Sequence, residues 1–270
     1  MIKKLLLFTV FTLLLIQGCK QEITVVNDLT YTEKLVVRAL LIAGQPIKVY
    51  LTKTLPLSGS YNPDDFNVKD ASASIVNENK KYSLTYSDSG YYISPGLNAS
   101  NGETYYLTTN WNGKQSTSQT TVPFSTQYQN ASLMTEVNGT DTTYFLQCML
   151  TPGTGAVYGV TWVIINADSV FRLEDTVIPE LMREQDKNLL NLLVLKTRNI
   201  PNDLITKWRR SLFIRVFAFD SQYYNFFLTQ NANVATTNIF NQSNINLRWN
   251  VKGDAIGMFI GETNFIIKVN

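Results

Sequence analysis

The feature that most constrains the fold is the recurrence of short apolar stretches separated by turn-forming residues between residues 34 and 124. Residues 46–53 (PIKVYLTK) alternate apolar and polar side chains, as a strand with one buried face requires. Residues 56–65 (PLSGSYNPDD) are too rich in turn formers to be a strand, and Asn112-Gly113 is typical of the centre of a tight hairpin. Because such strands recur about every eight to twelve residues, we expect residues 34–124 to form a β-sandwich of immunoglobulin or transthyretin type.

Residues 125–270 predict a second domain, which is β-rich (α+β) with one or two short helices. Asn138-Gly139 indicates a hairpin, and residues 158–167 and 211–220 have the apolar content and alternation of strands. Helices are expected at 201–210, where a proline stands near the start, and at 221–231. The chain as a whole is therefore expected to be mainly β.

The second expected helix has a capping residue and an apolar face. Ser221 can cap its start, and Tyr224, Phe227 and Leu228 share one face. After a polar stretch, we expect closing strands at 245–251, 255–260 and 263–269, with breaks at Gly253 and Gly261.

The N-terminus has the organisation of an export signal with a lipidation site. Lys3 and Lys4 precede a twelve-residue apolar run at 5–16, which is shorter than the roughly 20 residues of a membrane-spanning helix. Gly18 then stands before Cys19. We interpret residues 1–18 as a lipoprotein signal peptide, Cys19 as the diacylated residue and residues 19–33 as a lipidated tether. A plain signal peptide with an incidental cysteine is the alternative.

Charge and residue usage exclude several classes of function. Cleavage after Gly18 removes two lysines and leaves 21 basic against 21 acidic residues, so we expect no nucleic-acid partner. The chain contains no histidine, which excludes Ser-His-Asp and Cys-His catalysis and removes the commonest metal ligand. The remaining cysteine, Cys148, lies in an apolar stretch and is interpreted as a buried structural residue. We therefore expect no enzyme activity, no cofactor and no metal, with a carboxylate-dependent hydrolase as a distant alternative.

Neighbouring aromatic residues supply the candidates for ligand contacts. Adjacent side chains in a strand point to opposite faces, so one tyrosine of Tyr91-Tyr92 and one of Tyr105-Tyr106 is expected to face solvent. An exposed aromatic ring can stack on a sugar or contact a protein. The candidates for contact with a glycan or peptide are Tyr92, Tyr106, Trp111 and Trp208. The alternative is that these residues belong to the core and to ordinary surface.

Several motifs, in their order along the chain, resemble the Bacteroidota outer-membrane lipoprotein family known as domain of unknown function 4249. They are 48–53 (KVYLTK), 68–73 (VKDASA), 89–92 (SGYY), 102–107 (GETYYL), 121–123 (TVP), 217–220 (FAFD), 223–226 (YYNF) and 256–261 (IGMFIG). The resemblance implies an accessory lipoprotein, often found beside TonB-dependent outer-membrane receptors, without an established enzyme activity or known site residues.

Two further signals fit that resemblance. Residues 20–22 (KQE) are similar to the short charged segment that directs such lipoproteins to the cell surface. Thr142, Ser169 and Thr176 each follow an aspartate, as in the acceptor motif for O-glycosylation in Bacteroidota, although the motif is short enough to occur by chance.

The expected function is a non-catalytic lipoprotein held in the outer membrane by its lipid anchor, with the cell surface favoured over the periplasmic side. Such a protein would be an accessory or ligand-capture partner of a TonB-dependent transporter. The alternative is a structural or adhesive cell-surface protein that binds glycan or protein.

Overall fold

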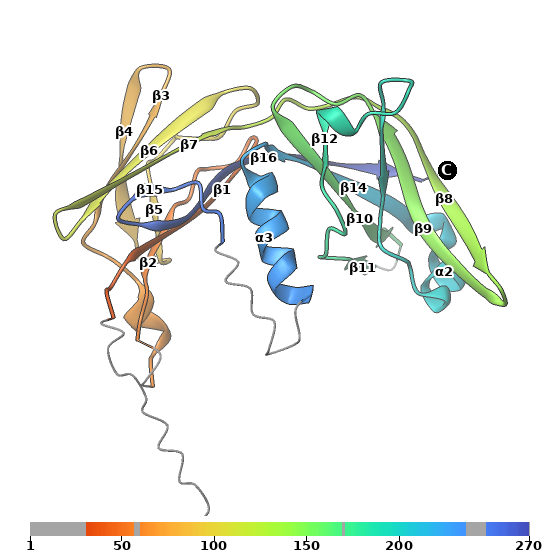
Figure 1. Cartoon of the computed structure of the whole chain (residues 1–270), viewed down its shortest axis with the longest axis horizontal. Coiled ribbons are helices and arrows are strands. Elements are labelled where there is room, and N and C mark those ends of the chain that lie inside the picture. The colour runs from red at the N-terminus through yellow and green to blue at the C-terminus, as the bar shows by residue number, and fades with distance from the viewer. Residues whose placement is uncertain (1–30, 57–59, 169–170, 236–246, 270) are drawn as a thin grey trace, which may run out of the picture. The chain divides into compact units, whose positions relative to one another are not determined.

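The structure is a computed structural model that describes residues 31–56, 60–168, 171–235 and 247–269. Residues Glu33–Asn270 form one compact unit. The described part of the chain is mainly β, with three sheets and two short α-helices (Figure 1), which confirms the expected fold class.

The largest sheet has seven strands and contains both the first and the last strand of the described chain. Its order is β11 (Phe171–Glu174), β10 (Ala156–Asn166), β14 (Leu212–Asp220), β16 (Ile256–Lys268), β1 (Leu35–Ile42) and β2 (Tyr50–Lys53), with β12 (Met182–Arg183) paired to β10. β1 runs parallel to β16, and the other neighbours in this sheet are antiparallel. The pairing of β1 with β16 therefore crosses the boundary that the sequence predicts between residues 124 and 125.

Two smaller sheets complete the β-structure. The six-stranded sheet has the order β15 (Lys252–Gly253), β7 (Lys114–Thr121), β6 (Thr104–Trp111), β3 (Ser72–Asn77), β4 (Lys80–Ser87) and β5 (Tyr91–Ile93). The three-stranded sheet has the order β13 (Leu193–Lys196), β9 (Asp141–Leu150) and β8 (Tyr128–Asn138).

Helical segments are short. In the described residues, the α-helices are α2 (Asn202–Trp208) and α3 (Tyr223–Ala235), and the 3-10 helices are η1 (Pro63–Phe66), η2 (Glu184–Asp186) and η3 (Arg209–Ser211). Both helices expected from the sequence are thus confirmed. Within the described residues, no helix is both long enough and apolar enough to cross a membrane.

The first core lies between the six-stranded sheet and the β1–β2 end of the seven-stranded sheet. Val37 and Leu41 of β1 contribute to it from one side, and Ile75 of β3 and Leu107 of β6 contribute from the other. Each of these side chains is almost fully buried. This is the sandwich arrangement that the alternating residues of 34–124 predict, but its second layer also includes Phe259 of β16, close to the end of the chain.

The other end of the seven-stranded sheet is covered on both faces. On one face, the three-stranded sheet packs through Leu146 and Leu195 against β10, β14 and β16. On the opposite face, Phe227 of α3 packs with Val157 and Phe219 in a separate apolar cluster. Leu228, which the sequence places on the same helix face, is instead 47 % exposed.

Buried hydroxyl groups on the inner face of β7 bind the C-terminal segment. Ser118 Oγ donates to the carbonyl oxygen of Asn250 at 3.1 Å, and Ala255 N–H donates to Ser116 Oγ at 2.9 Å. Thr120 Oγ1 accepts from Gly261 N–H at 2.7 Å. These hydrogen bonds join the six-stranded sheet to residues more than 130 positions later in the chain.

Gly261 corrects one sequence expectation, because it lies inside the continuous strand β16 and does not interrupt it. A Cβ atom at this position would lie 2.4 Å from the carbonyl oxygen of Thr121. Glycine is therefore required here for the close approach of two backbones. The expected strand at 245–251 is also wrong where it can be assessed, since residues 247–251 have no strand structure.

Candidate ligand-binding groove

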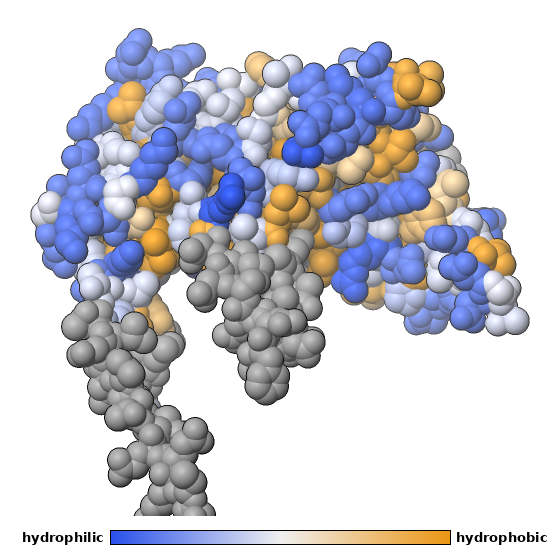
Figure 2. All heavy atoms as spheres, in the orientation of Figure 1, coloured by the Kyte–Doolittle hydropathy of each residue, from blue (hydrophilic) through white to orange (hydrophobic). Residues whose placement is uncertain are grey.

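The six-stranded sheet has one face in the first core and one face in solvent. Along β7, the burial pattern alternates: Ser116, Ser118 and Thr120 are buried, whereas Gln115, Thr117 and Gln119 are exposed. The same alternation in β3, β4 and β6 places the outward side chains of four neighbouring strands side by side. In Figure 2, the surface over β3, β4 and β6 is mainly hydrophilic or neutral in colour.

Strand register arranges the outward side chains in rows across the sheet. In the central row, Ser74 of β3 stands between Ser83 of β4 and Thr108 of β6, and Thr108 is followed by Thr117 of β7. Because directly paired residues have Cβ atoms about 5 Å apart, these hydroxyl groups form a continuous polar row.

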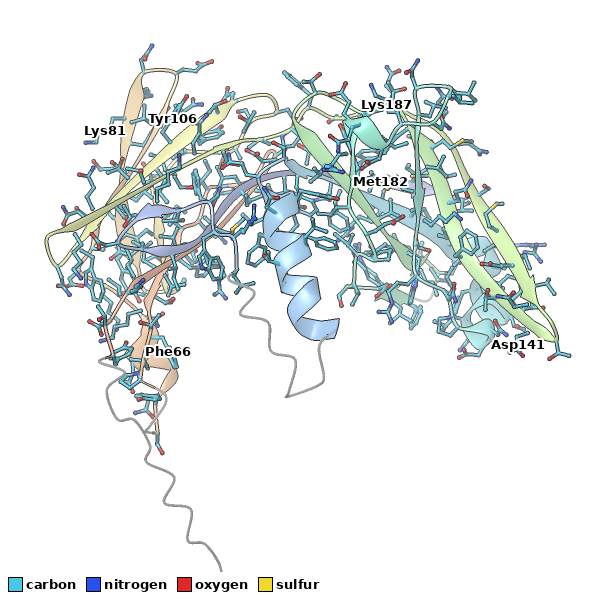
Figure 3. All side chains as sticks on the ribbon, in the orientation of Figure 1. Phe66, Lys81, Tyr106, Asp141, Met182 and Lys187 are labelled. Carbon is cyan, nitrogen blue, oxygen red and sulfur yellow. The ribbon has the colours of Figure 1, made fainter. Side chains whose placement is uncertain are left out.

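A second row lies two residues along the strands and contributes amides. It consists of Ser72 of β3, Asn110 of β6 and Gln115 of β7. A third row on the other side of the central row contains Lys81 of β4 and Tyr106 of β6, which both pair with β3. Figure 3 shows Lys81 and Tyr106 on this sheet.

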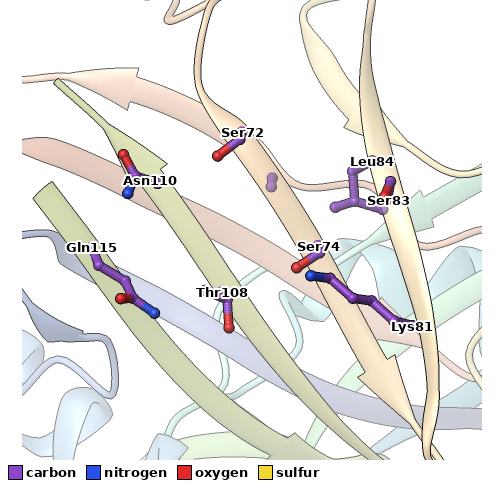
Figure 4. A pocket seen from close by; sticks show the side chains of 9 residues that line it. Ser72, Ser74, Lys81, Ser83, Leu84, Thr108, Asn110 and Gln115 are labelled. Atoms are coloured by element: carbon purple, nitrogen blue, oxygen red, sulfur yellow. The ribbon is translucent and has the colours of Figure 1, made fainter. Parts of the chain in front are cut away.

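These strands form a groove with a volume of about 380 Å³. Its lining consists of Ser72, Ala73, Ser74, Lys81, Ser83, Leu84, Thr108, Asn110 and Gln115. Figure 4 shows the hydroxyl and amide groups distributed along the groove, with the Lys81 side chain extending towards Ser74. The lining therefore offers hydroxyls, two amides and one ammonium group, and it contains no carboxylate.

The polar groups in the groove have no partner within the described part of the chain. No hydrogen bond or ion pair there involves the side chains of the seven polar lining residues. This distinguishes the hydroxyls of the groove from the inner hydroxyls of β7, which bind the C-terminal segment. The groove thus presents donors and acceptors that a bound molecule can satisfy.

Of the four aromatic candidates, Tyr106 has the placement that the sequence predicts. It is 48 % exposed, whereas its neighbour Tyr105 is fully buried, as the alternation requires. Tyr106 lies on the same strand and the same face as Thr108 of the groove.

The structure corrects the expectation that Tyr92 contacts a ligand, because this residue is only 2 % exposed and belongs to the first core. Its hydroxyl donates to the carbonyl oxygen of Val68 at 3.0 Å and accepts from Ala71 N–H at 3.1 Å. Burial raises the pKa of this hydroxyl. The sequence places one of Tyr91 and Tyr92 inside, and the structure shows that Tyr92 is the inner one.

The two tryptophan candidates are half-buried and already engaged. Trp111 Nε1 donates to Asp70 Oδ1 at 3.1 Å, and its ring packs against the first core. Trp208 stacks on Phe171 with 4.8 Å between ring centroids, in the other half of the molecule. The structure therefore does not bring these two rings together with Tyr106.

The modification sites expected from the sequence lie in different environments. Thr176 is exposed, and Thr142 is half-buried near the start of β9. Ser169 and Cys19 lie outside the described residues.

Cys148 is buried in β9, with 1 % of its surface exposed, which confirms its interpretation as a structural residue. Burial raises the pKa of its thiol to about 12, so the reactive thiolate is suppressed at neutral pH. Across the described ranges, no cluster of three or more histidine, cysteine, aspartate or glutamate residues is arranged to hold a metal ion.

The groove residues are not among the candidates found from the sequence. Residues 115–121 (QSTSQTT) are polar on both faces of β7, so their pattern does not show which face is buried. In β3, Ser72 and Ser74 alternate with the buried Ala73 and Ile75, and this alternation was an available signal for the outer face. In β7, the only signal is the run of uncharged polar residues. Distinguishing its two faces requires the C-terminal segment that covers one of them.

Comparison with known proteins supports the resemblance seen in the motifs. No curated protein matches the chain. The profile of one family matches residues 21–264, which is nearly the whole chain. The chain therefore belongs to the family described as Domain of unknown function (DUF4249).

Proposed function

We propose that this protein is a non-catalytic, lipid-anchored accessory protein of the outer membrane that captures a ligand for a TonB-dependent transporter. The observation that carries the proposal is the groove on the six-stranded sheet, whose polar side chains have no partner in the described structure. Its hydroxyl, amide and ammonium groups suit binding, and its lining has no pair of acids for hydrolysis.

The N-terminal sequence supports attachment to a membrane. Cys19 follows a small residue at the end of a short apolar run, and the following residues up to 33 supply a tether. Each buried methylene of an acyl chain contributes about 0.8 kcal/mol, so two or three chains hold a protein stably at the membrane surface.

The anchor is tested by Cys19→Ala. We expect the variant to fold but to lose its association with the outer-membrane fraction and its incorporation of labelled palmitate. Cys148→Ala is the matched control, because Cys148 is buried in a strand and should not be lipidated. Unchanged outer-membrane fractionation of Cys19→Ala would refute the anchor.

The transporter partnership is tested by affinity purification of the full chain from detergent-solubilised envelope. We expect a TonB-dependent receptor to co-purify with the native protein. Recovery of glycans or other envelope proteins without any receptor would instead support the structural or adhesive alternative.

A further inference from the structure

We infer that the groove on the six-stranded sheet binds a neutral oligosaccharide, with Tyr106 as a stacking ring beside it. This inference rests on the ligand-capture part of the proposed function and names the class of ligand. Its basis is the chemistry of the lining, the register of the strands and the exposure of Tyr106.

The hydrogen-bonding groups of the groove match those of a sugar. Serine and threonine hydroxyls both donate and accept, and the amides of Asn110 and Gln115 add two donors and an acceptor each. Asn110 and Gln115 are paired directly across β6 and β7, so both amides reach the same part of a ligand. A chain of vicinal hydroxyl groups can satisfy this mixture of donors and acceptors.

The groove favours a neutral ligand over an acidic one. Lys81 is the one charged residue in its lining. Arginine, which binds carboxylates and phosphates through two parallel hydrogen bonds, is missing from this lining. The single ammonium group of Lys81 can donate to sugar hydroxyls in the same way as the neighbouring amides.

Tyr106 adds an apolar surface beside the polar groups. It is two residues from Thr108 on β6 and on the same face, which places it about 7 Å along the strand. No ring pair among the described residues includes Tyr106, and nearly half of its surface is exposed. Its ring is therefore available to stack on the apolar face of a sugar ring.

The extent of the polar surface favours an oligosaccharide over a single sugar. The central row crosses four strands, from Ser83 to Thr117, at a spacing of about 4.8 Å per strand. One further row lies on each side of it. A ligand that engages the amides and the tyrosine at once must bridge the central row of hydroxyls.

The test is calorimetric titration of the detergent-purified full chain with cellohexaose, maltohexaose, mannohexaose and hexagalacturonate. We expect at least one of the three neutral hexasaccharides to bind more tightly than the acidic one. Its affinity should not change between low and high salt, because an uncharged ligand is not subject to ionic screening.

Variants locate the site. We expect Tyr106→Ala and Asn110→Ala each to weaken binding about five- to tenfold, as the loss of one stacking ring or one amide predicts. The matched controls are Tyr128→Ala, at a tyrosine of 49 % exposure, and Asn130→Ala, at an exposed asparagine; both lie on β8 of the three-stranded sheet and should not change binding.

Several outcomes would overturn the inference. One is that none of the three neutral hexasaccharides binds at concentrations up to about 5 mM, which corresponds to a binding free energy of only about 3 kcal/mol. Another is that hexagalacturonate binds more tightly than the neutral hexasaccharides and in a salt-sensitive way. The third is that the Tyr106 and Asn110 variants bind with unchanged affinity. Co-purification of a receptor by a protein that binds no hexasaccharide would refute this inference and leave the proposed partnership intact. If the protein binds a neutral hexasaccharide but co-purifies with no receptor, this inference stands and the proposed transporter partnership is refuted.

Discussion

The strands β7 and β10 show how differently two sheets of the same molecule are covered. Nine consecutive residues of β10, from 156 to 164, are buried. The three-stranded sheet covers one face of the strand, and α3 together with the segment that contains Ile178 and Leu181 covers part of the other. In β7, burial alternates and every outward residue is polar. One end of the molecule therefore buries both faces of its sheet, whereas the six-stranded sheet leaves one face open to solvent.

The physical basis of this difference is in the side chains. β10 (AVYGVTWVIIN) is apolar on both faces, and such a strand is stable only when both faces are removed from water. The outer face of β7 carries amides and hydroxyls that remain solvated without a covering layer. Apolar burial contributes about 25 cal/mol per Å², so covering the β10 face is favourable and covering the β7 face is not.

The largest predicted effect is on the free energy of unfolding, and it is tested by replacing one aromatic residue in each region. Phe219 is 5 % exposed; its ring stacks on Phe217 at 5.8 Å between centroids and lies tilted against Tyr223 at 4.6 Å. We expect Phe219→Ala to lower the free energy of unfolding by about 4 kcal/mol in denaturant titrations. Tyr106→Ala, on the open face, should cost about 0.5 kcal/mol. Similar losses in the two variants would show that the open face is covered in solution.

A smaller effect is expected at the contact between the two regions. Asp220, at the end of β14, accepts from Thr120 Oγ1 at 2.9 Å and from Thr121 N–H at 2.7 Å on β7. Asp220→Ala removes these two bonds and a third, from Gln222 N–H to Asp220 Oδ1 at 2.9 Å, and leaves two partly buried N–H groups without their partner. We expect a loss of about 2 kcal/mol in the free energy of unfolding.

The control for this variant is Asp254→Ala, because Asp254 is an exposed aspartate in the C-terminal segment. The control should unfold like the native protein. If both variants were equally stable, the hydrogen bonds of Asp220 would contribute nothing to joining the sheets.

The smallest effect concerns the pH dependence of stability on the covered face. Glu262 of β16 is 4 % exposed, and burial raises the pKa of its carboxyl, partly opposed by the Asn264 amide and the charge of Arg215. A raised folded-state pKa means that the folded protein holds this proton more tightly than the unfolded chain. Its contribution to stability is therefore present at pH 4 and is lost as the pH rises through the folded-state pKa.

In Glu262→Gln the side chain cannot ionise. The free energy of unfolding of this variant should therefore rise relative to that of the native protein as the pH increases from 4 to 8. Denaturant titrations at both pH values measure this change, and Glu136→Gln, at an exposed position of β8, is the control. A stability difference that does not vary with pH would show that Glu262 is not desolvated in solution.

The candidate site was only partly predictable from the sequence. The alternation in 103–109 (ETYYLTT) predicts that one of Tyr105 and Tyr106 is exposed, and the structure confirms this. The same argument for Tyr91-Tyr92 gave the wrong candidate, because alternation fixes that neighbours differ but not which one faces the core. The hydroxyl row of the groove was missed, because alternation can place Ser74 and Thr108 on an outer face but cannot show that β4, β3, β6 and β7 lie side by side. For Thr117 even the face could not be read, since β7 is polar on both faces and has no apolar period.

Local patterns in the sequence by themselves determined the mainly β class, the hairpin at Asn112-Gly113, the two helices and the burial of Cys148. These features depend on neighbouring residues, so a single chain segment contains the information. Only the tertiary structure decided that β1 pairs with β16, that Gly261 permits a close backbone approach, and that one polar face of β7 is buried while the other is open. Each of these depends on residues more than 100 positions apart, whose contact no local pattern encodes.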